Sequence, residues 1–301
     1  MKDTQPKDKK GSYVPHKAAA EFRPTIDWSI KRAAELYEER IFTLEVDKIH
    51  FKDCIKGMQD LPSESIDMLI ADPPFGLNFG DMEPLYNRDS NFVAEGYKDV
   101  LIENYSTFTD KWIIEIPRLL KDDGGVWIFS GWTNLVDILN SLRDNNLKLI
   151  NHIIWKYQFG VFTRRKFVTS HYHILFAVKN EKNYFFNKIE HYPEDVWYFK
   201  REYDRGIKKN ATKLPIDLVL RCIDFGSKPG DVIMDPFIGN GTTAFAAKGS
   251  FRHYIGFEIN SKLEDIINKS LKNVELGQYY IPYSERPDEL VLKARKKFKK
   301  K

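Results

Sequence analysis

Short apolar runs alternate with amphipathic stretches along this 301-residue chain. Seven runs have the composition of buried strands and span residues 48–51, 66–72, 124–130, 149–156, 172–179, 231–235 and 253–258. Five stretches space their apolar residues at helical intervals and span residues 25–42, 108–121, 133–145, 213–226 and 241–249. Because strands alternate with helices, the pattern predicts βαβ units in an α/β fold with a mostly parallel sheet.

Residues 180–210 fit neither period and are rich in Tyr, Phe, Trp and basic side chains. We interpret them as part of an inserted recognition element that covers about residues 156–210. Residues 1–24 are polar, lysine-rich and interrupted by proline, which predicts a flexible N-terminal tail. The expected catalytic domain then spans residues 25–275, and residues 276–301 form a C-terminal extension with a basic tail.

The strand-like run IDMLIAD ends on Asp72 and continues into Pro73, Pro74 and Phe75. Two successive prolines fix their own φ angles, donate no main-chain hydrogen bond and keep the residues before them out of the helical region. This rigid turn would hold a carboxylate, a free proline carbonyl and an aromatic ring at the carboxyl end of a strand, where open α/β sheets bind ligands. Taken alone, the stretch fits a proline-rich turn without chemistry equally well.

A second stretch, DVIMDPFIGNGTTAFAAKG, joins a strand that ends at Asp235 to a helix that opens at Thr242. Gly239 and Gly241 permit unusual φ angles and let a ligand approach bare main chain. The following strand ends at Glu258, where an acid can accept hydrogen bonds from a ribose diol. Although the glycines alone could form a simple strand-to-helix turn, the whole pattern predicts a ribose-bearing cofactor.

Two kinds of cofactor suit this loop. GNGTTA matches G-x-G-x-x-A, a pattern of nicotinamide dinucleotide sites. However, Asp235 would place a negative charge beside a pyrophosphate, whereas the same charge complements the ammonium of a methionine moiety. S-adenosylmethionine is therefore the better fit. No Gly-Lys-Ser/Thr follows the glycines, which excludes a P-loop.

The net charge of +4 is unevenly distributed. Residues 151–210 carry 12 Lys/Arg and 6 Asp/Glu, and the tail KARKKFKKK (293–301) carries seven basic residues and no acid. This asymmetry indicates a polyanionic partner that meets one part of the surface, although the tail alone is typical of a solvated chain end. Arg164, Arg165 and Lys166 are the expected phosphate contacts.

Other residues narrow the class of protein. Cys54 and Cys222 lie outside any CxxC pattern, so we expect reduced thiols and neither a disulfide framework nor a zinc site. His171 and His173 share one face of a strand but have no third ligand nearby, which favours half-buried polar positions over metal ligands. No apolar run reaches about 18 residues and no signal-peptide core is present, which predicts a soluble, cytoplasmic protein.

Together the two motifs resemble those of β-class S-adenosylmethionine-dependent DNA amino methyltransferases, which methylate adenine N6 or cytosine N4. That family's D/N/S-P-P-Y/F/W motif stands here as Asp72-Pro73-Pro74-Phe75, and its D-P-F-x-G-x-G-T-T motif occupies residues 235–243. The catalytic motif precedes the cofactor motif, which is the permuted order of the β class. The resemblance covers roughly residues 45–275. It implies a Rossmann-like class I methyltransferase fold with an antiparallel edge hairpin, and S-adenosylmethionine as cofactor.

The resemblance also assigns roles to individual residues. The implied catalytic residues are Asp72, Pro73, Pro74 and Phe75. The implied cofactor-binding residues are Asp53, near the adenine, and Asp72, Asp235, Pro236, Phe237, Gly239, Asn240, Gly241, Thr242, Thr243 and Glu258. NATKLP (210–215) departs from the family's H-P-T-x-K-P, because Asn210 and Ala211 replace His-Pro and Leu214 stands where lysine is expected. The carboxylate-binding lysine would then correspond to Lys213, one place early.

The implied activity is site-specific methylation of a flipped-out base in double-stranded DNA, with the loop at residues 76–91 closing over that base. Asp at position 72 is typical of N6-adenine enzymes, whereas N4-cytosine enzymes usually carry serine there. Cytosine N4 therefore remains an alternative, and so does a non-catalytic DNA-binding subunit with the same fold. Whether the enzyme has a cognate restriction endonuclease or acts alone, and whether it is a monomer or a homodimer, is left open by the sequence.

Overall fold

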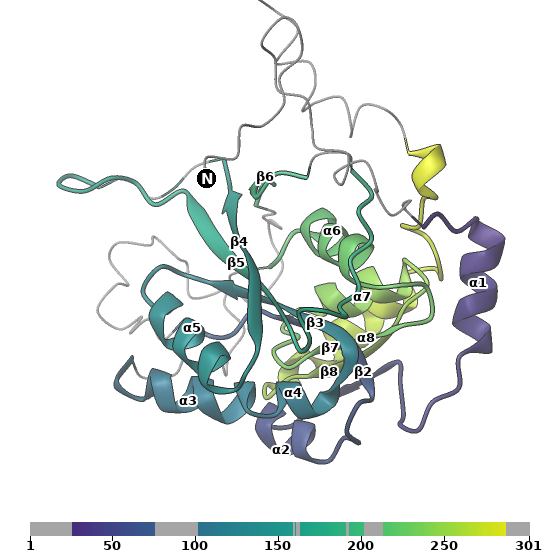
Figure 1. The fold of residues 1–301 in the computed structure, drawn as a ribbon, viewed down its shortest axis with the longest axis horizontal. Coiled ribbons are helices and arrows are strands. Elements are labelled where there is room, and N and C mark those ends of the chain that lie inside the picture. Colours follow the sequence, from purple (N-terminus) through teal and green to yellow (C-terminus); the bar gives the residue numbers. More distant parts are fainter. Residues whose placement is uncertain are drawn as a thin grey trace, which may run out of the picture.

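The computed structural model describes residues 26–75, 102–158, 160, 163–190, 193–201 and 213–286. One eight-stranded sheet runs through the molecule in the order β1-β8-β7-β2-β3-β5-β4-β6 (Figure 1). The strands are β1 (Lys48–His50), β2 (Ile66–Ala71), β3 (Leu120–Ser130), β4 (Lys148–Lys156), β5 (His171–Val178), β6 (Val196–Tyr198), β7 (Val232–Asp235) and β8 (His253–Phe257).

Most neighbouring strands are parallel, as the alternating pattern predicts. The pairs β1–β8, β8–β7, β7–β2 and β2–β3 are parallel, and β5 runs antiparallel to both β3 and β4. The short strand β6 pairs in parallel with β4 and forms the outermost strand, so the antiparallel hairpin lies next to the edge.

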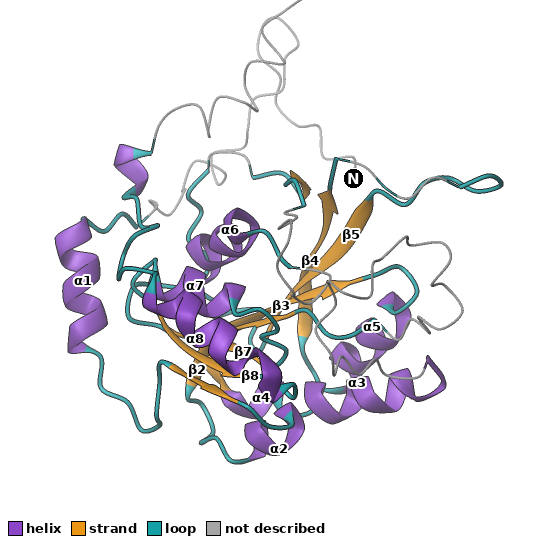
Figure 2. Cartoon of the chain, turned by 180° about the vertical axis from the view of Figure 1, so that it is seen from behind, coloured by secondary structure: helices purple, strands orange, loops and turns teal. Residues whose placement is uncertain are grey.

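Helices cover both faces of the sheet (Figure 2). They are α1 (Ile30–Glu39), α2 (Cys54–Gln59), α3 (Tyr105–Ile113), α4 (Ile116–Leu119), α5 (Leu135–Asp144), α6 (Ile216–Gly226), α7 (Thr242–Lys248) and α8 (Glu264–Lys272). Successive side chains of β2 alternate between two apolar clusters. Met68 and Ile70 pack with α6 and α7, whereas Leu69 and Ala71 pack with α2, α3 and α5. Burial on both faces explains why β2 reads as a continuous apolar run.

The predicted helix at 108–121 is wrong as a single element. It divides into α3 and α4, and its last two residues begin β3. Pro117 lies in the first turn of α4, where a missing N–H costs nothing, whereas the interior of one long helix would not tolerate it. The helix expected at 25–42 begins at Ile30, because Ser29 is the N-cap of α1 and its Oγ accepts a hydrogen bond from the Arg32 amide at 3.2 Å.

The basic, aromatic stretch also contributes to the fold. Trp197 of β6 is 7% exposed and packs in the same apolar cluster as Ile189, with Tyr184 and Phe199 against it. Several of its aromatic side chains are therefore core residues. Within the described residues, no helix is long and apolar enough to cross a membrane. Both terminal tails and the loop at 76–91 lie outside the described residues.

Candidate active site

Strands β2 and β7 bring the two sequence motifs together. They are adjacent and parallel, with Leu69 opposite Met234, so their carboxyl ends lie at the same edge of the sheet. Asp72 directly follows β2, and Asp235 is the last residue of β7. From β2 the chain continues to β3 on one side, and from β7 to β8 on the other. This reversal of strand order is the place where open α/β sheets bind ligands.

The charge of Asp235 in the second motif acts on Asp72 in the first. Burial and, to a lesser degree, the nearby Asp235 charge raise the pKa of Asp72 to about 7, against the opposing charge of Arg201. Burial likewise raises the pKa of Asp235 to about 7, against the hydrogen bonds it accepts. The two acids therefore lie close together at the same edge of the sheet.

The glycine loop has defined hydrogen bonds. Asp235 Oδ1 accepts from the Phe237 amide at 2.9 Å, and its Oδ2 accepts from the Thr243 hydroxyl at 2.5 Å. Gly241 is the N-cap of α7 with φ of 87°, and an added Cβ would lie 2.9 Å from the ring of Phe245. A side chain there would be strained in conformation and in contact, so the position requires glycine.

Two further acids complete the carboxyl edge. Glu258 follows β8 and accepts hydrogen bonds from the amides of Asn260, at 2.8 Å, and Gly239, while burial raises its pKa. Asp53 follows β1 and caps α2, its Oδ1 accepting from the Lys56 amide at 3.1 Å. Both Asp53 and Asp235 raise the pKa of Cys54, after burial, which places Asp53 beside the same site. The predicted acids of β1, β8, β7 and β2 thus form one row.

The remaining predicted cofactor residues that the structure describes are buried or half-buried. Phe237 packs edge-on against Trp112 with ring centroids 5.3 Å apart, which anchors the loop in the core. Thr242 and Thr243 are buried in the first turn of α7. Lys213 is half-buried shortly before α6.

Several side chains that the sequence motifs did not identify lie around the catalytic motif, and two of them are aromatic. Phe75 stacks on Tyr172 of β5, with ring centroids 5.4 Å apart and planes 26° apart. The Phe75 carbonyl accepts a hydrogen bond from Asn134 Nδ2 at 2.8 Å. The guanidinium of Arg201 lies 4.0 Å from the Tyr157 ring centroid. These partners come from separate elements of the fold, and no sequence motif marks them as neighbours of the catalytic turn.

The three expected phosphate contacts lie elsewhere on this edge. Arg164, Arg165 and Lys166 are exposed in the connection between β4 and β5, which projects from the body of the molecule (Figure 1). Because β4 ends and β5 begins at the edge that carries Asp72, this arm, described at residues 157, 158, 160 and 163–170, starts beside the site. Phe167, next to the basic residues, is fully exposed.

Comparison with known proteins gives the family. The profile of the N6/N4 DNA methylases, described as DNA methylase, matches residues 66–269. The chain belongs to this family. It is a β-class S-adenosylmethionine-dependent DNA methyltransferase of the restriction–modification type, with a Rossmann-like class I fold, and the predicted family and cofactor are confirmed.

Sequence similarity to individual methyltransferases supports the same family. It is 28% identical over 252 residues to the type II methyltransferase M.HinfI of Haemophilus influenzae, covering 74% of this chain and 67% of that one. It is 30% identical over 242 residues to the type II methyltransferase M2.DpnII of Streptococcus pneumoniae, covering 73% and 87% of the two chains.

Solved structures share the fold of the methylase. The complex of M1.HpyAVI with S-adenosylmethionine is 23% identical with a TM-score of 0.53, covering 74% of this chain and 98% of that one. The cytosine-N4-specific PvuII DNA methyltransferase is 16% identical with a TM-score of 0.58, covering 78% and 96%. At these identities the likeness concerns the fold alone.

Proposed function

We propose that this methylase transfers a methyl group to the N6 amino group of adenine at a specific site in double-stranded DNA. The observation that supports it most is the junction of β2 and β7, where the Asp72-Pro73-Pro74-Phe75 turn adjoins the glycine loop. An aspartate rather than a serine at position 72 favours adenine over cytosine.

The residues of this edge fit the cofactor. Asp72, Asp235 and Glu258 are acids whose pKa is raised chiefly by burial, so a bound cation would relieve an unfavourable concentration of negative charge. S-adenosylmethionine supplies an electrophilic methyl group on a positively charged sulfur. We assign its binding to Asp53, Asp72, Lys213, Glu258 and the segment from Asp235 to Thr243, which includes Pro236, Phe237, Gly239, Asn240, Gly241 and Thr242.

The reaction needs a better nucleophile than a free adenine amino group, whose lone pair is delocalised into the ring. The Asp72 carboxylate and the Pro73 carbonyl accept hydrogen bonds from the two amino hydrogens, which favours a pyramidal nitrogen with a directed lone pair. As the nitrogen gains a methyl group it loses one proton, and Asp72, whose pKa is about 7, is a suitable acceptor. Phe75 stacks on the extruded base, worth on the order of 1–3 kcal/mol.

The arm and the neighbouring strands form the proposed DNA contact, within a target-recognition region at about residues 156–210. Arg164, Arg165 and Lys166 neutralise phosphates, and the exposed ring of Phe167 contacts bases. The target base must leave the helix, because N6 is not accessible in the duplex.

The test is methyl transfer to defined duplex oligonucleotides, followed by nucleoside analysis of the product. N6-methyldeoxyadenosine is expected. N4-methyldeoxycytidine would overturn the adenine assignment in favour of the alternative, and DNA binding without any transfer would favour a non-catalytic subunit. Long-read sequencing of DNA from a host that expresses the chain would identify the recognition sequence, with the Asp72→Ala variant as the matched control.

A further inference from the structure

Arg201 is fixed in place beside the catalytic motif. Its guanidinium lies 4.0 Å from the ring centroid of Tyr157 and 4.8 Å from that of Tyr172. Its amide donates to Gln158 Oε1 at 2.8 Å, and its carbonyl accepts from Gln158 Nε2 at 3.2 Å. Two tyrosine faces and a reciprocal main-chain clamp therefore hold a residue that follows the outermost strand, β6.

This position connects Arg201 to the proposed catalytic residues in two ways. Tyr172, beneath its guanidinium, stacks in turn on Phe75. Its charge also acts on Asp72, lowering a pKa that burial and Asp235 raise.

Among the described residues, three groups from different elements interact electrostatically with Asp72. Asp235 lies at the end of β7, Arg201 follows β6, and Tyr105 on α3 is close enough for the Asp72 charge to add to the rise in its own pKa, which is chiefly due to burial. Arg201 is the cation in this set. Without it, burial and Asp235 would both act to protonate Asp72.

We propose that Arg201 is a positioning residue for methyl transfer: it supports the Tyr172–Phe75 stack and provides the positive charge that keeps Asp72 an ionised hydrogen-bond acceptor. This inference rests on the proposed role of Asp72. A protonated carboxyl group would keep one acceptor oxygen but could no longer take up the proton released from the amino group. Arg201 thus widens the pH range in which the site is competent.

The first experiment measures the pH profile of kcat, with DNA and S-adenosylmethionine saturating, for wild type, Arg201→Gln, Arg201→Lys and Lys200→Gln. The acid limb is the part of the profile in which kcat falls as the pH is lowered. Arg201→Gln should shift this limb to a pH about one unit higher, so that kcat on the limb falls about tenfold at a given pH. Arg201→Lys, which keeps the charge, should restore the limb. Lys200 is the exposed neighbouring cation, and its loss should leave the limb in place.

A second experiment is independent of activity. An acid whose pKa is raised in the folded state destabilises the fold above that pKa, and the penalty disappears as the pH falls below its unfolded pKa. Arg201→Gln should therefore increase the unfolding equilibrium constant by about tenfold more at pH 8.5 than at pH 5.5, if the pKa rises by one unit. In an Asp72→Asn background this extra loss should vanish, because the titrating group is absent.

The outcomes separate the two proposals. An unshifted limb in Arg201→Gln, or an equal loss of stability at both pH values, overturns the role of Arg201 while an inactive Asp72→Asn variant upholds that of Asp72. A raised KM for DNA with an unchanged limb would make Arg201 a phosphate contact instead, and also overturns it. An Asp72→Asn variant with wild-type activity overturns both proposals.

Discussion

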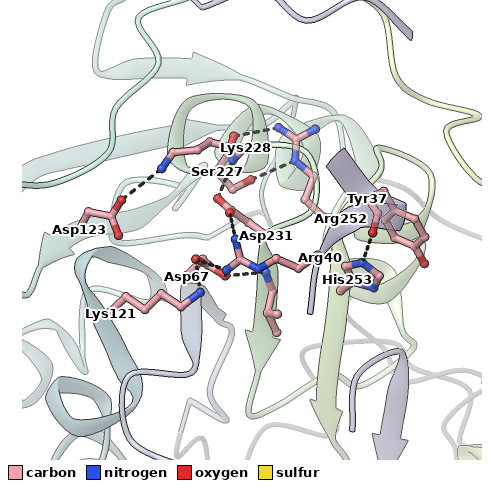
Figure 3. A network of polar contacts seen from close by, with 11 residues as sticks. Tyr37, Arg40, Asp67, Lys121, Asp123, Ser227, Lys228, Asp231, Arg252 and His253 are labelled. Carbon is pink, nitrogen blue, oxygen red and sulfur yellow. Dashed lines mark hydrogen bonds and ion pairs between the residues drawn. The ribbon is translucent and has the colours of Figure 1, made fainter. Parts of the chain in front are cut away.

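Strands β2 and β7 carry buried or half-buried acids at both of their ends, and the partners of these acids differ between the two ends. At the amino ends, Asp67 accepts hydrogen bonds from Arg40, at 2.9 and 3.0 Å, from Lys121 at 2.7 Å and from the Val232 amide at 2.9 Å (Figure 3). Asp231 accepts from the Lys228 amide at 2.7 Å and lies 3.7 Å from Arg40.

At the carboxyl ends of β2, β7 and the neighbouring β8, no ion pair of Asp72, Asp235 or Glu258 is found among the described residues. Asp235 and Glu258 accept hydrogen bonds from hydroxyl and amide groups, and the charge of Arg201 lowers the pKa of Asp72. The protein thus neutralises one end with its own cations. The other end keeps a negative charge that matches a cationic ligand. The comparison indicates that the amino-end cluster stabilises the fold, whereas the carboxyl-end acids are kept for binding and catalysis at some cost in stability.

The largest expected effect separates activity from stability. Asp72→Asn replaces an acceptor with an amide that can donate, so methyl transfer should fall by about 10²–10³. The free energy of unfolding at pH 8 should stay the same or rise, because a neutral amide is buried more easily than a carboxylate. Single-turnover transfer and urea unfolding measure the two quantities. A variant that loses stability along with activity would contradict the comparison.

The opposite end should respond the other way. Asp67→Ala leaves Arg40 and Lys121 without their shared partner and should lower the free energy of unfolding by roughly 2–4 kcal/mol, discounted because both cations remain partly exposed. The folded fraction should keep its rate of transfer. Asp123→Ala is the control, since its exposed pair with Lys228 should contribute less than about 1 kcal/mol. Equal effects of the two variants would refute a stabilising cluster.

The pH dependence of cofactor binding sharpens the comparison further. A cation binds best when Asp72 and Asp235 are ionised, so affinity for S-adenosylmethionine should weaken as the pH falls through 7, by about tenfold between pH 8 and pH 6. Titration calorimetry in buffers of different ionisation enthalpy would detect the released protons. Asp235→Asn should reduce this dependence. Asp231→Asn should not, although burial also raises the pKa of Asp231 to about 7, because that acid lies at the other end of the strand.

The smallest effect concerns DNA. Arg165→Ala should weaken binding a few-fold and reduce the slope of log affinity against log salt by about 1, uniformly across sequences. Lys228→Ala removes a partly exposed cation from the amino end and should leave the slope unchanged. Fluorescence anisotropy at several salt concentrations tests both. A matching change in the two variants would mean that DNA does not bind at the carboxyl edge.

Local patterns predicted much of this structure. The seven expected strands all form, and the acids at the ends of β2, β7 and β8 lie in one row because parallel strands end at the same edge. The helix predicted at 108–121 is divided near Pro117, because proline has no amide hydrogen to donate within a helix even where the apolar spacing continues. The three-residue strand β6 carries too little pattern to be detected, and pairing with β4 determines its conformation.

The sequence by itself determined the chemistry of the two motifs, because DPPF and DPFIGNGTT are contiguous and their backbone requirements are local. Only the tertiary structure decided their surroundings. The contact of Phe75 with Tyr172, the approach of Arg201 to Asp72 and the shared partner of Arg40 and Lys121 all join residues that are distant in the chain. Such contacts depend on which strands pair and in which register. The electrostatic effect of each contact also depends on how deeply its residues are buried, and a short segment becomes buried only when the sheet forms.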